Sequence, residues 1–450
     1  MVSVKSSDIP ITYRDPALSL PSQYAGELIS LNILGKIIVV INTQRVAKDL
    51  LEKGGAIISG RPDILFAEMV GWMRNNVSML PYRQRWHERR RVMDPSLRPN
   101  SIPDYHHILH DHASSMVRAI IAEPDKAAEL LTYCMASIIA SVVYGYDITG
   151  MEDEFISVAE RVGDYGKHLR LGALLVNHIP LLHHLPSWFP GCGFQALIQK
   201  AKQDTQNMID SPFESVKVKM ACTLPCILSH PAPQSLMKYF LIVQAAGIAR
   251  PSITSTTLSG LLLALCQYPS VQRSAQEELD RVIGRDKLPD FSDRANLPYL
   301  NAICQELLRW KVVIPLGIPH AAMEDSTYEG YFIPKVPLTQ NITRSILHDA
   351  ERYPEPLSFK PERFISADGK FIEDSTVSAA FGFGKRKCPG RHFADASMWA
   401  FVALLLATSE VSDARDEKGE KFGDNIEWVD GFLSHPPKFT FKIVPRDKTA

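Results

Sequence analysis

The residues best suited to chemistry lie in one short stretch, Phe381 to Gly390, which is rich in glycine and contains one cysteine. Cys388 comes just before a predicted helix that begins near Pro389. Its neighbours in sequence include four cationic residues: Lys385, Arg386, Lys387 and Arg391. A helix N-terminus and nearby cations both favour the thiolate over the thiol. Because glycine has no Cβ, this loop can approach a flat ligand closely. A thiolate held there is suited to ligating iron.

The same stretch matches a longer pattern, Phe-x-x-Gly-x-Arg-x-Cys-x-Gly. Its fixed positions are filled by Phe381, Gly384, Arg386, Cys388 and Gly390. This pattern resembles the haem-binding signature of the cytochrome P450 family. The resemblance implies that Cys388 ligates the iron of haem b and that Phe381, Arg386 and Gly390 belong to the cofactor-binding loop. The competing interpretation is a buried structural cysteine beside a glycine turn, as most lone cysteines are.

A second motif concerns the polar edge of the cofactor. Trp86 and Arg90 stand at positions i and i+4 of a predicted helix and share one of its faces. Their Trp-x-x-x-Arg spacing is similar to the family's. Haem propionates are anionic, so an indole N–H and a guanidinium are suited to binding them. The resemblance adds His320 as a further propionate ligand, although a loop histidine with local hydrogen bonds explains that residue equally well.

The segment from Ser235 to Gln267 is predicted to form the long central helix that crosses the distal face of haem in this family. Family members usually carry an acid-alcohol pair here, which helps deliver protons to dioxygen. Counting back from Pro269 places Ser252 at the position of the acid and Thr254 just after the pair, and no Asp or Glu occurs between positions 214 and 277. Ser252 and Thr254 are therefore the candidate catalytic residues of a substituted proton relay.

The resemblance implies a haem-thiolate monooxygenase that inserts one oxygen atom of O2 into a mostly apolar small molecule, by hydroxylation or epoxidation. Motifs such as Gly317-Ile-Pro-His320-Ala are similar to those of fungal, basidiomycete-type P450s of secondary metabolism. Xenobiotic oxidation is a related possibility. The missing acid leaves two alternatives open: a haem-thiolate isomerase or dehydratase that does not activate O2, and an inactive haem-binding copy.

Electrons are expected from NADPH through NADPH–cytochrome P450 reductase, as the family implies. A basic docking face for that partner is predicted from residues near the cysteine loop and the Trp86 helix: Arg83, Arg85, Arg89, Arg91, Lys385, Lys387 and Arg391. Ordinary solvated surface charge is the alternative explanation of these residues.

A set of three charges is expected to support the cysteine loop without taking part in the chemistry. Glu306 and Arg309 stand at positions i and i+3 of a predicted helix, and Arg363 completes the set. In the family these charges form a buried network, whereas an exposed pair of this kind contributes at most about 1 kcal/mol. Substrate contacts are expected from three stretches of apolar residues: Phe66, Met69 and Trp72; Val313, Ile314 and Leu316; Phe432 and Leu433. For the first group, a plain buried loop is an equal alternative.

The expected fold class is mainly α with a smaller β-rich lobe, as a single P450 domain over residues 27–450. Length alone, 450 residues, would suggest two or three domains. Two strands are predicted around Gly35, followed by a helix capped by Thr43. A helix is predicted around residues 86–90, further helices over residues 125–146, 152–170, 269–284, 299–310 and 395–407, and a terminal hairpin tip over residues 431–437.

Composition excludes some functions and leaves the location open. The net charge of −1 gives no general attraction to nucleic acid, and seven scattered cysteines indicate reduced thiols. No run of about eighteen apolar residues is found, so no transmembrane helix is predicted. Residues 1–26 lack the anchor that fixes eukaryotic relatives to the cytoplasmic face of the endoplasmic reticulum membrane, so a soluble protein is also possible. The apolar, proline-punctuated segment 171–193 is a candidate for peripheral contact with a bilayer.

Overall fold

The computed structural model describes residues 2–5, 26–33, 36–168, 184–185, 194–223, 252–335, 338–422, 426–431 and 433–446. The chain divides into two compact units. Unit 1 contains Met1–Gly60, Ile102–Cys134 and Ser252–Ala450, and unit 2 contains Arg61–Ser101 and Met135–Pro251. Each unit is described by itself.

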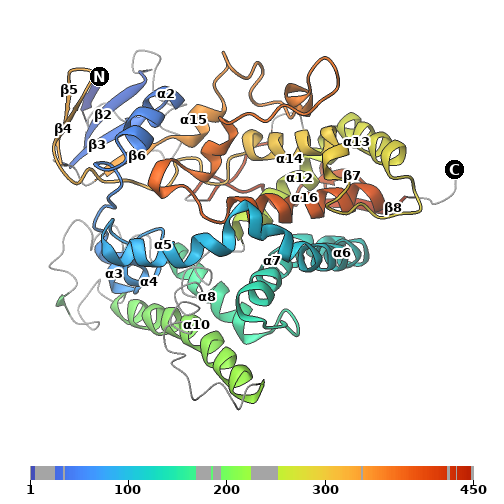
Figure 1. Ribbon diagram of the computed structural model, residues 1–450, viewed down its shortest axis with the longest axis horizontal. Helices are drawn as coiled ribbons and strands as arrows, with labels where there is room; N and C mark the ends of the chain where they lie inside the picture. Colours follow the sequence, from blue (N-terminus) through green and yellow to red (C-terminus); the bar gives the residue numbers. More distant parts are fainter. Residues whose placement is uncertain are drawn as a thin grey trace. The chain divides into compact units, whose positions relative to one another are not determined.

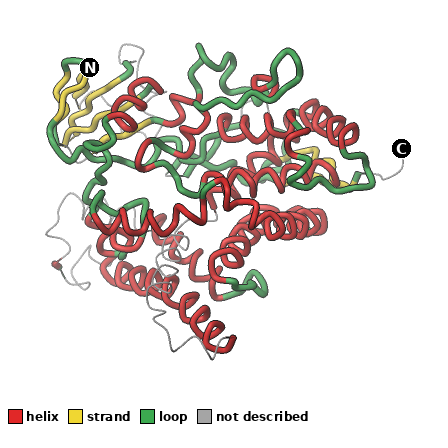
Figure 2. Tube along the Cα trace, viewed as in Figure 1, coloured by secondary structure: helices red, strands yellow, loops and turns green. Residues whose placement is uncertain are grey.

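The β-rich part of unit 1 is a sheet with strand order β1-β2-β3-β6. Its strands are β1 (Val2–Lys5), β2 (Leu28–Ile33), β3 (Lys36–Ile41) and β6 (Leu338–Asn341). The pair β2–β3 is antiparallel, and β6 adds to β3 in parallel with Ile38 opposite Leu338. Figure 2 shows these strands side by side. The β-branched run of β3 favours a strand, and the two strands predicted around Gly35 are confirmed.

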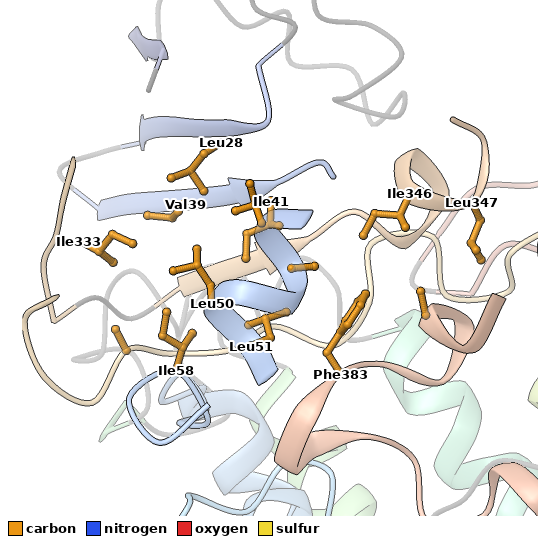
Figure 3. Packing of buried hydrophobic residues seen from close by; sticks show 14 of the residues in the cluster. Leu28, Val39, Ile41, Leu50, Leu51, Ile58, Ile333, Ile346, Leu347 and Phe383 are labelled. Carbon is orange, nitrogen blue, oxygen red and sulfur yellow. The ribbon is translucent and has the colours of Figure 1, made fainter. Parts of the chain in front are cut away.

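A short helical segment follows β3 and covers the sheet. Helix α2 (Gln44–Ala47) continues without a break into a π-helix, η3 (Lys48–Lys53). The Thr43 hydroxyl accepts a hydrogen bond from the Val46 N–H at 3.5 Å, so the predicted N-cap is confirmed. Leu50 and Leu51 of η3 pack with Val39 and Ile41 of the sheet in one buried cluster, whose members are shown in Figure 3.

The remainder of unit 1 is mainly helical (Figure 1). Its helices are α6 (His106–Ala122), α12 (Ser252–Gln267), α13 (Pro269–Val282), α14 (Pro298–Trp310) and α16 (Arg391–Thr408). Prolines open α13 and α14 at their first positions, where the missing N–H costs nothing. Helix α16 is buried continuously over residues 396–406 and packs against α6 and α14, so it lies in the core.

Short elements complete unit 1. They are the hairpin β4 (Ser326–Tyr328) with β5 (Tyr331–Ile333), helix α15 (Thr343–Leu347), the pair β7 (Ser409–Arg415) with β8 (Thr440–Pro445), and 3-10 turns η5 (Pro124–Lys126), η8 (Arg294–Asn296), η9 (Pro361–Phe364), η10 (Val377–Phe381) and η11 (Gly384–Arg386). An isolated antiparallel bridge between Val429 and His435 closes the predicted terminal hairpin.

Unit 2 is helical where it is described. Its helices are α3 (Leu65–Met69), α4 (Trp72–Asn75), α5 (Gln84–Leu97), α8 (Glu154–His168) and α10 (Phe194–Thr223). Helix α7 (Ala127–Tyr144) and the 3-10 turn η4 (Pro99–Tyr105) contain residues of both units. The core of unit 2 includes Phe66, Val70, Tyr165 and Ile198. The helix predicted around residues 86–90 is confirmed as part of the longer α5, and those predicted over 125–146 and 152–170 are confirmed with ends shifted by a few residues.

The described helices include one that is long and rich in apolar residues. The helical segment Pro124–Tyr144 is long and apolar enough to cross a membrane by length and composition, with a mean hydropathy of 1.6. It is not an uninterrupted apolar run, because Glu129 lies among the apolar residues near the start of α7. Half of the apolar window is buried inside the protein, as in an ordinary core helix. Most of segment 171–193, the first part of the predicted central helix and Phe432 lie outside the described residues.

Candidate haem-thiolate site

The cysteine loop is a chain of tight turns between η10 and α16. Gly382 ends η10 with φ +80°, a backbone conformation that residues with a Cβ rarely adopt. The Cys388 N–H then donates to the Phe381 carbonyl at 2.8 Å, which closes the loop. Gly390 is the N-cap of α16, so Cys388 lies just before the positive end of this helix. The helix was expected near Pro389 and begins at Arg391.

The β-rich part of unit 1 holds this loop in place. Phe383 is buried to 4% exposure and packs in the same cluster as Leu50 and Leu51 (Figure 3). Gly384, at φ +51°, lies so close to the Leu51 carbonyl oxygen that a Cβ would overlap it. The Arg386 Nε–H donates to the Ser59 carbonyl at 2.8 Å. The loop is therefore fixed by packing, close backbone contact and a hydrogen bond.

Cationic side chains surround the cysteine. The Arg391 guanidinium donates to the carbonyl oxygen of Cys388 itself at 3.2 Å. The Lys387 ammonium donates to the Ser378 hydroxyl at 2.9 Å. Partial burial, and then the charge of Arg391, lowers the pKa of Lys387 below its ordinary value. Positive charge is thus concentrated at this point, where a thiolate is the favoured form of a cysteine.

The other cysteines whose surroundings are described differ from Cys388. Burial raises the pKa of Cys134, Cys266 and Cys304 to about 12, so these thiols stay neutral at physiological pH. Cys388 is half-buried. An accessible thiol at the end of a rigid loop, beside cations and a helix N-terminus, has the donor chemistry that a haem iron requires, so the residues present fit this cofactor.

Two predicted cofactor-binding residues come together on one short segment. The ring Nδ1 of buried His320 lies 2.8 Å from the Ile58 carbonyl oxygen, and Arg386 donates to the carbonyl of the next residue, Ser59. Since a carbonyl only accepts, the proton of the neutral His320 ring is on Nδ1. The backbone of His320 also pairs with Thr339 of β6, the last strand in the order of the sheet. Both side chains are therefore oriented by the same piece of backbone.

Trp86 and Arg90 lie on one face of α5 in unit 2. The Arg90 guanidinium carbon is 5.7 Å from the centroid of the Trp86 ring, and its Nε pairs with Asp94 at 3.2 Å. Trp86 is buried and packs on Tyr82. The predicted docking face needs correction at Arg89, which is fully buried and donates to the Asn75 carbonyl. Burial, and then Arg85, lowers the pKa of Arg89 to about 10.

The three charges expected to support the loop are brought together. Arg309 and Glu306 form a bidentate pair at 2.6 and 2.7 Å, and both side chains are fully buried. Arg363 approaches the same carboxylate at 3.4 Å. Arg309 also donates to the carbonyls of Leu347 and Pro356. This network fixes the segment 347–363 against α14, which also contacts η10 at the start of the cysteine loop.

The predicted substrate contacts divide between the two units. Phe66, Met69 and Trp72 belong to the core of unit 2, where the rings of Phe66 and Trp72 meet edge to face. In unit 1, Val313 is buried, whereas Ile314, Leu316 and Leu433 are half-buried. The Ser434 N–H donates to the Val313 carbonyl at 2.8 Å, so the structure joins two of the predicted stretches.

The candidate relay residues lie in the first turn of α12 as it is described. Thr254 is half-buried, and nothing is described of the Ser252 side chain. The neighbouring Ser255 hydroxyl accepts a hydrogen bond from Thr132 of α7 at 3.2 Å. Thr257 donates to the Ile253 carbonyl of its own helix. The relay role of Ser252 and Thr254 stays a prediction.

Some residues that shape the site were not predicted from the sequence. Leu51 and Ser59 hold the cysteine loop through their backbone carbonyls, which any residue type supplies, so their side chains give no signal. Both lie more than 300 positions before the loop. Only the glycine at position 384 indicated that another segment must come close.

Comparisons with known proteins agree with this geometry. The family model described as Cytochrome P450 matches residues 18–443. The chain is 34% identical to Cytochrome P450 monooxygenase 208 of Postia placenta, over 94% of this chain and 85% of the relative. It is 33% identical to Cytochrome P450 monooxygenase claR of Ampulloclitocybe clavipes, over 94% and 81%. It is 31% identical to Tryptamine 4-monooxygenase of Psilocybe cyanescens, over 94% and 86%.

These relatives are monooxygenases by name, and the family uses haem b, O2 and electrons that pass from NADPH through a reductase. The mainly α fold with a smaller β-rich lobe agrees with the match. The anchored cysteine loop, the match over most of the chain and the identity to several fungal relatives all support one assignment. The chain belongs to the cytochrome P450 family of haem-dependent oxidoreductases.

Proposed function

We propose that the protein is a haem-thiolate monooxygenase of secondary metabolism that hydroxylates or epoxidises a mostly apolar small molecule. The observation that carries the proposal is the cysteine loop, in which Cys388 is set before α16 while Phe383 and Gly384 are locked against η3. Such anchoring is what a ligand must have if it is to hold a metal centre in a constant position.

The cofactor supplies the oxygen-activating chemistry, and the chain supplies its ligand and orientation. Cys388 would provide the thiolate. Arg386, whose Nε–H is held by the Ser59 carbonyl, would bind a propionate through its other N–H groups. His320 would bind one as the imidazolium, whose Nε2–H donates to the propionate while its Nδ1–H donates to the Ile58 carbonyl. Trp86 and Arg90 would bind the polar edge in the same way, through an indole N–H and a guanidinium.

A substituted proton relay would start at the first turn of α12. Of the hydroxyls described there, Ser255 is engaged with Thr132 and Thr257 with its own helix backbone. Thr254 is half-buried and lies just after the position of the family's acid-alcohol pair, so it is the proposed residue to pass a proton, together with Ser252 two positions before it. Replacing Thr254 by Val removes the hydroxyl at nearly constant volume, so NADPH consumption uncoupled from product should rise. Unchanged coupling excludes Thr254 from the relay.

The reductase is proposed to dock at the cationic side of the cysteine loop. Lys385 is exposed, whereas Lys387 and Arg391 are half-buried and engaged within the loop. Lys385→Glu therefore tests docking without disturbing the loop, and slower reduction by the reductase at low salt is expected. Equal rates for the variant and the wild type would contradict the proposal. Attachment to the endoplasmic reticulum membrane, through residues near 171–193 among others, is proposed from the family alone.

The first experiment is the absorption spectrum of the reduced, carbon-monoxide-bound protein. A strongly red-shifted Soret band is expected, and it should be lost in Cys388→Ala but kept in the matched variant Cys266→Ala. Turnover should then require NADPH, a reductase and O2, with label from isotopic dioxygen in the product. The substrate panel includes tryptamine, because one relative is named Tryptamine 4-monooxygenase. Product formation without NADPH would instead favour an isomerase or dehydratase. The absence of a red-shifted Soret band would overturn the proposal.

A further inference from the structure

The segment that carries the predicted substrate contacts Val313, Ile314 and Leu316 ends in a tight turn. The Gly317 N–H donates to the Ile314 carbonyl at 3.0 Å, which closes a four-residue β-turn. Pro315 is the second residue of this turn, where its fixed φ is favoured, and Gly317 is the fourth, with φ +63°. Ile314 and Leu316, the first and third residues, are half-buried. The sequence therefore specifies the turn, and the turn presents the two side chains.

The turn satisfies one of its carbonyls by itself, and the others need partners from elsewhere in the chain. The Val313 carbonyl, just before the turn, accepts the Ser434 N–H at 2.8 Å. The Pro315 carbonyl accepts the Arg344 N–H at 3.0 Å. Both of these donors are backbone groups, which a change of side chain leaves in place.

The last two carbonyls of the turn are held by one side chain. Gln340 of β6 donates from its Nε2 to the Leu316 carbonyl, and the same nitrogen lies 3.4 Å from the Gly317 carbonyl oxygen. Because both neighbours only accept, it is the nitrogen of the amide that faces the turn, and its two N–H groups can serve both carbonyls. Gln340 thus fixes the second half of the turn through its side chain.

Strand β6 connects this side chain to the cofactor site. Thr339, the residue before Gln340, exchanges two backbone hydrogen bonds with His320, at 2.8 and 2.6 Å. The strand itself pairs in parallel with β3, where Val40 is opposite Gln340. Two successive residues of one strand therefore hold a proposed propionate ligand and the turn with the predicted substrate contacts. The strand fixes the position of one relative to the other.

We propose that Gln340 is a positioning residue that determines substrate specificity, because its amide holds the turn and thereby sets where Ile314 and Leu316 meet a bound ligand. This inference rests on the proposed function, since the ligand is the substrate of the proposed monooxygenase. Without the hydrogen bonds from Gln340, the turn must become ordered when a ligand binds, and this ordering reduces the affinity. Only a ligand large enough to reach the turn should respond.

The experiment compares two iron-coordinating probes in the haem-loaded protein, imidazole and the bulkier 4-phenylimidazole. Both bind the same metal, so the ratio of their Kd values cancels changes at the iron and reports contacts further away. Gln340→Met nearly keeps the volume of the side chain and removes its donors. The affinity for 4-phenylimidazole relative to imidazole should fall by about three- to tenfold, as expected for one lost hydrogen bond. An unchanged ratio, or tighter relative binding of 4-phenylimidazole, would overturn the proposal.

A second variant separates donation by this side chain from a general loss of packing. In Gln340→Glu, a carboxylate without a donor faces two carbonyl oxygens at neutral pH. Only the protonated form donates to them, and this hydrogen bond raises the pKa of the new carboxyl above the ordinary value of about 4.3. Compared with the wild type at the same pH, relative binding of 4-phenylimidazole should be weak at pH 8 and partly restored at pH 5.5. An equal deficit at both values of pH would contradict the role of Gln340 as a donor.

The matched control is Gln276→Met, which removes an equivalent hydrogen bond elsewhere in unit 1. The Nε2 of Gln276 in α13 donates to the Ser409 carbonyl of β7 at 3.0 Å. This variant should keep the wild-type ratio of Kd values, because its hydrogen bond does not hold the turn. If the ratio fell as much as in Gln340→Met, any lost hydrogen bond in unit 1 would have the same effect, and the proposal would be wrong.

A readout that needs no thiolate ligation separates this inference from the proposed function. In the full-length protein, amide hydrogen exchange at Gly317 should be faster in Gln340→Met than in the wild type and in Gln276→Met, because the turn opens more often. This result would support the positioning role even if the carbon-monoxide spectrum showed no thiolate. A red-shifted band together with unchanged exchange would overturn this inference and leave the proposed function in place. Faster exchange with an unchanged ratio of Kd values would mean that Gln340 does not determine specificity.

Discussion

Gly384 of the cysteine loop and Leu51 of η3 are in direct backbone contact, 333 positions apart in sequence. The Leu51 carbonyl oxygen occupies the space where a Cβ at position 384 would lie, and Glu52 Cα would be only 3.2 Å from it. The same glycine has φ +51°. The β-rich part of unit 1 thus fixes the position of the loop that carries Cys388, and only a residue without a Cβ permits this contact.

The first prediction concerns this contact. Gly384→Ala should displace the loop, because the added Cβ would overlap backbone atoms of Leu51 and Glu52, which cannot move aside as a flexible side chain can. Haem content, measured as the ratio of Soret to protein absorbance, should fall severalfold, and the protein should melt at a lower temperature. Gly369→Ala is the control: it has φ +77° but open space around it, so only the backbone cost of about 1–2 kcal/mol is expected. Similar losses in both variants would mean that φ alone explains Gly384.

The second prediction concerns the buried pair of Glu306 and Arg309. Glu306→Gln leaves the guanidinium without its counter-charge in a site with no exposure, so the free energy of unfolding should fall by about 3–5 kcal/mol. Urea unfolding measures this change.

The control is Glu123→Gln, since Glu123 and Lys126 form an exposed pair with the same i,i+3 spacing. That variant should lose at most about 1 kcal/mol. A loss at Glu306 as small as at Glu123 would show that the network does not support segment 347–363.

The local elements were largely predictable, because their signals lie within a few residues. Thr43 before an apolar run predicts a helix start, and prolines at 269 and 298 predict the first residues of two helices. The cysteine loop and its glycines were equally predictable, because backbone φ values of +80° at Gly382 and +51° at Gly384 favour glycine.

The contacts that position the site were not predictable. Arg386 and His320 depend on the carbonyls of Ser59 and Ile58, and a backbone carbonyl leaves no mark in the sequence. Burial of Arg89 was missed because its neighbours Arg85 and Arg91 are exposed and charge in sequence does not reveal which side of a helix is covered. The arrangement of Lys311, Trp310 and Trp428 joins residues more than 100 positions apart, which no local pattern indicates.

The third prediction concerns pH and His348. Burial, and then Arg309, lowers the pKa of His348 to about 3 in the folded protein. The ring is therefore neutral near physiological pH, and its Nε2 donates to the Trp310 carbonyl at 2.8 Å. The unfolded chain takes up this proton below its ordinary pKa of about 6.5, and stability should therefore fall as the pH drops from 6.5 towards 3.

Between pH 6.5 and pH 5 this histidine should account for about 2 kcal/mol of the loss. His348→Gln keeps a donor for the Trp310 carbonyl and removes the titration, so its urea unfolding curve should depend less on pH by that amount. His107→Gln, at an exposed histidine, should change nothing. An equal pH dependence in wild type and His348→Gln would rule out the burial of a neutral ring at this position.

The fourth prediction concerns the contact between Gly260 of α12 and Trp428, which belongs to the C-terminal loop of residues 428–435. A Cβ at Gly260 would lie 3.0 Å from the ring edge of Trp428, which is too close for an ordinary contact but involves a side chain of a loop that can shift. Gly260→Ala should therefore leave the fold intact, and alanine is the better helix former by about 1 kcal/mol. The displaced indole should speed amide exchange in residues 428–435. Because Leu433 of this loop is a predicted substrate contact, it should also weaken binding of the bulky iron ligand 4-phenylimidazole relative to the smaller imidazole. Combined with Trp428→Phe, which shortens the ring, the substitution should have a smaller effect on both measurements. If Gly260→Ala left the ratio of affinities for 4-phenylimidazole and imidazole unchanged, the position of Trp428 would not affect the rest of the loop.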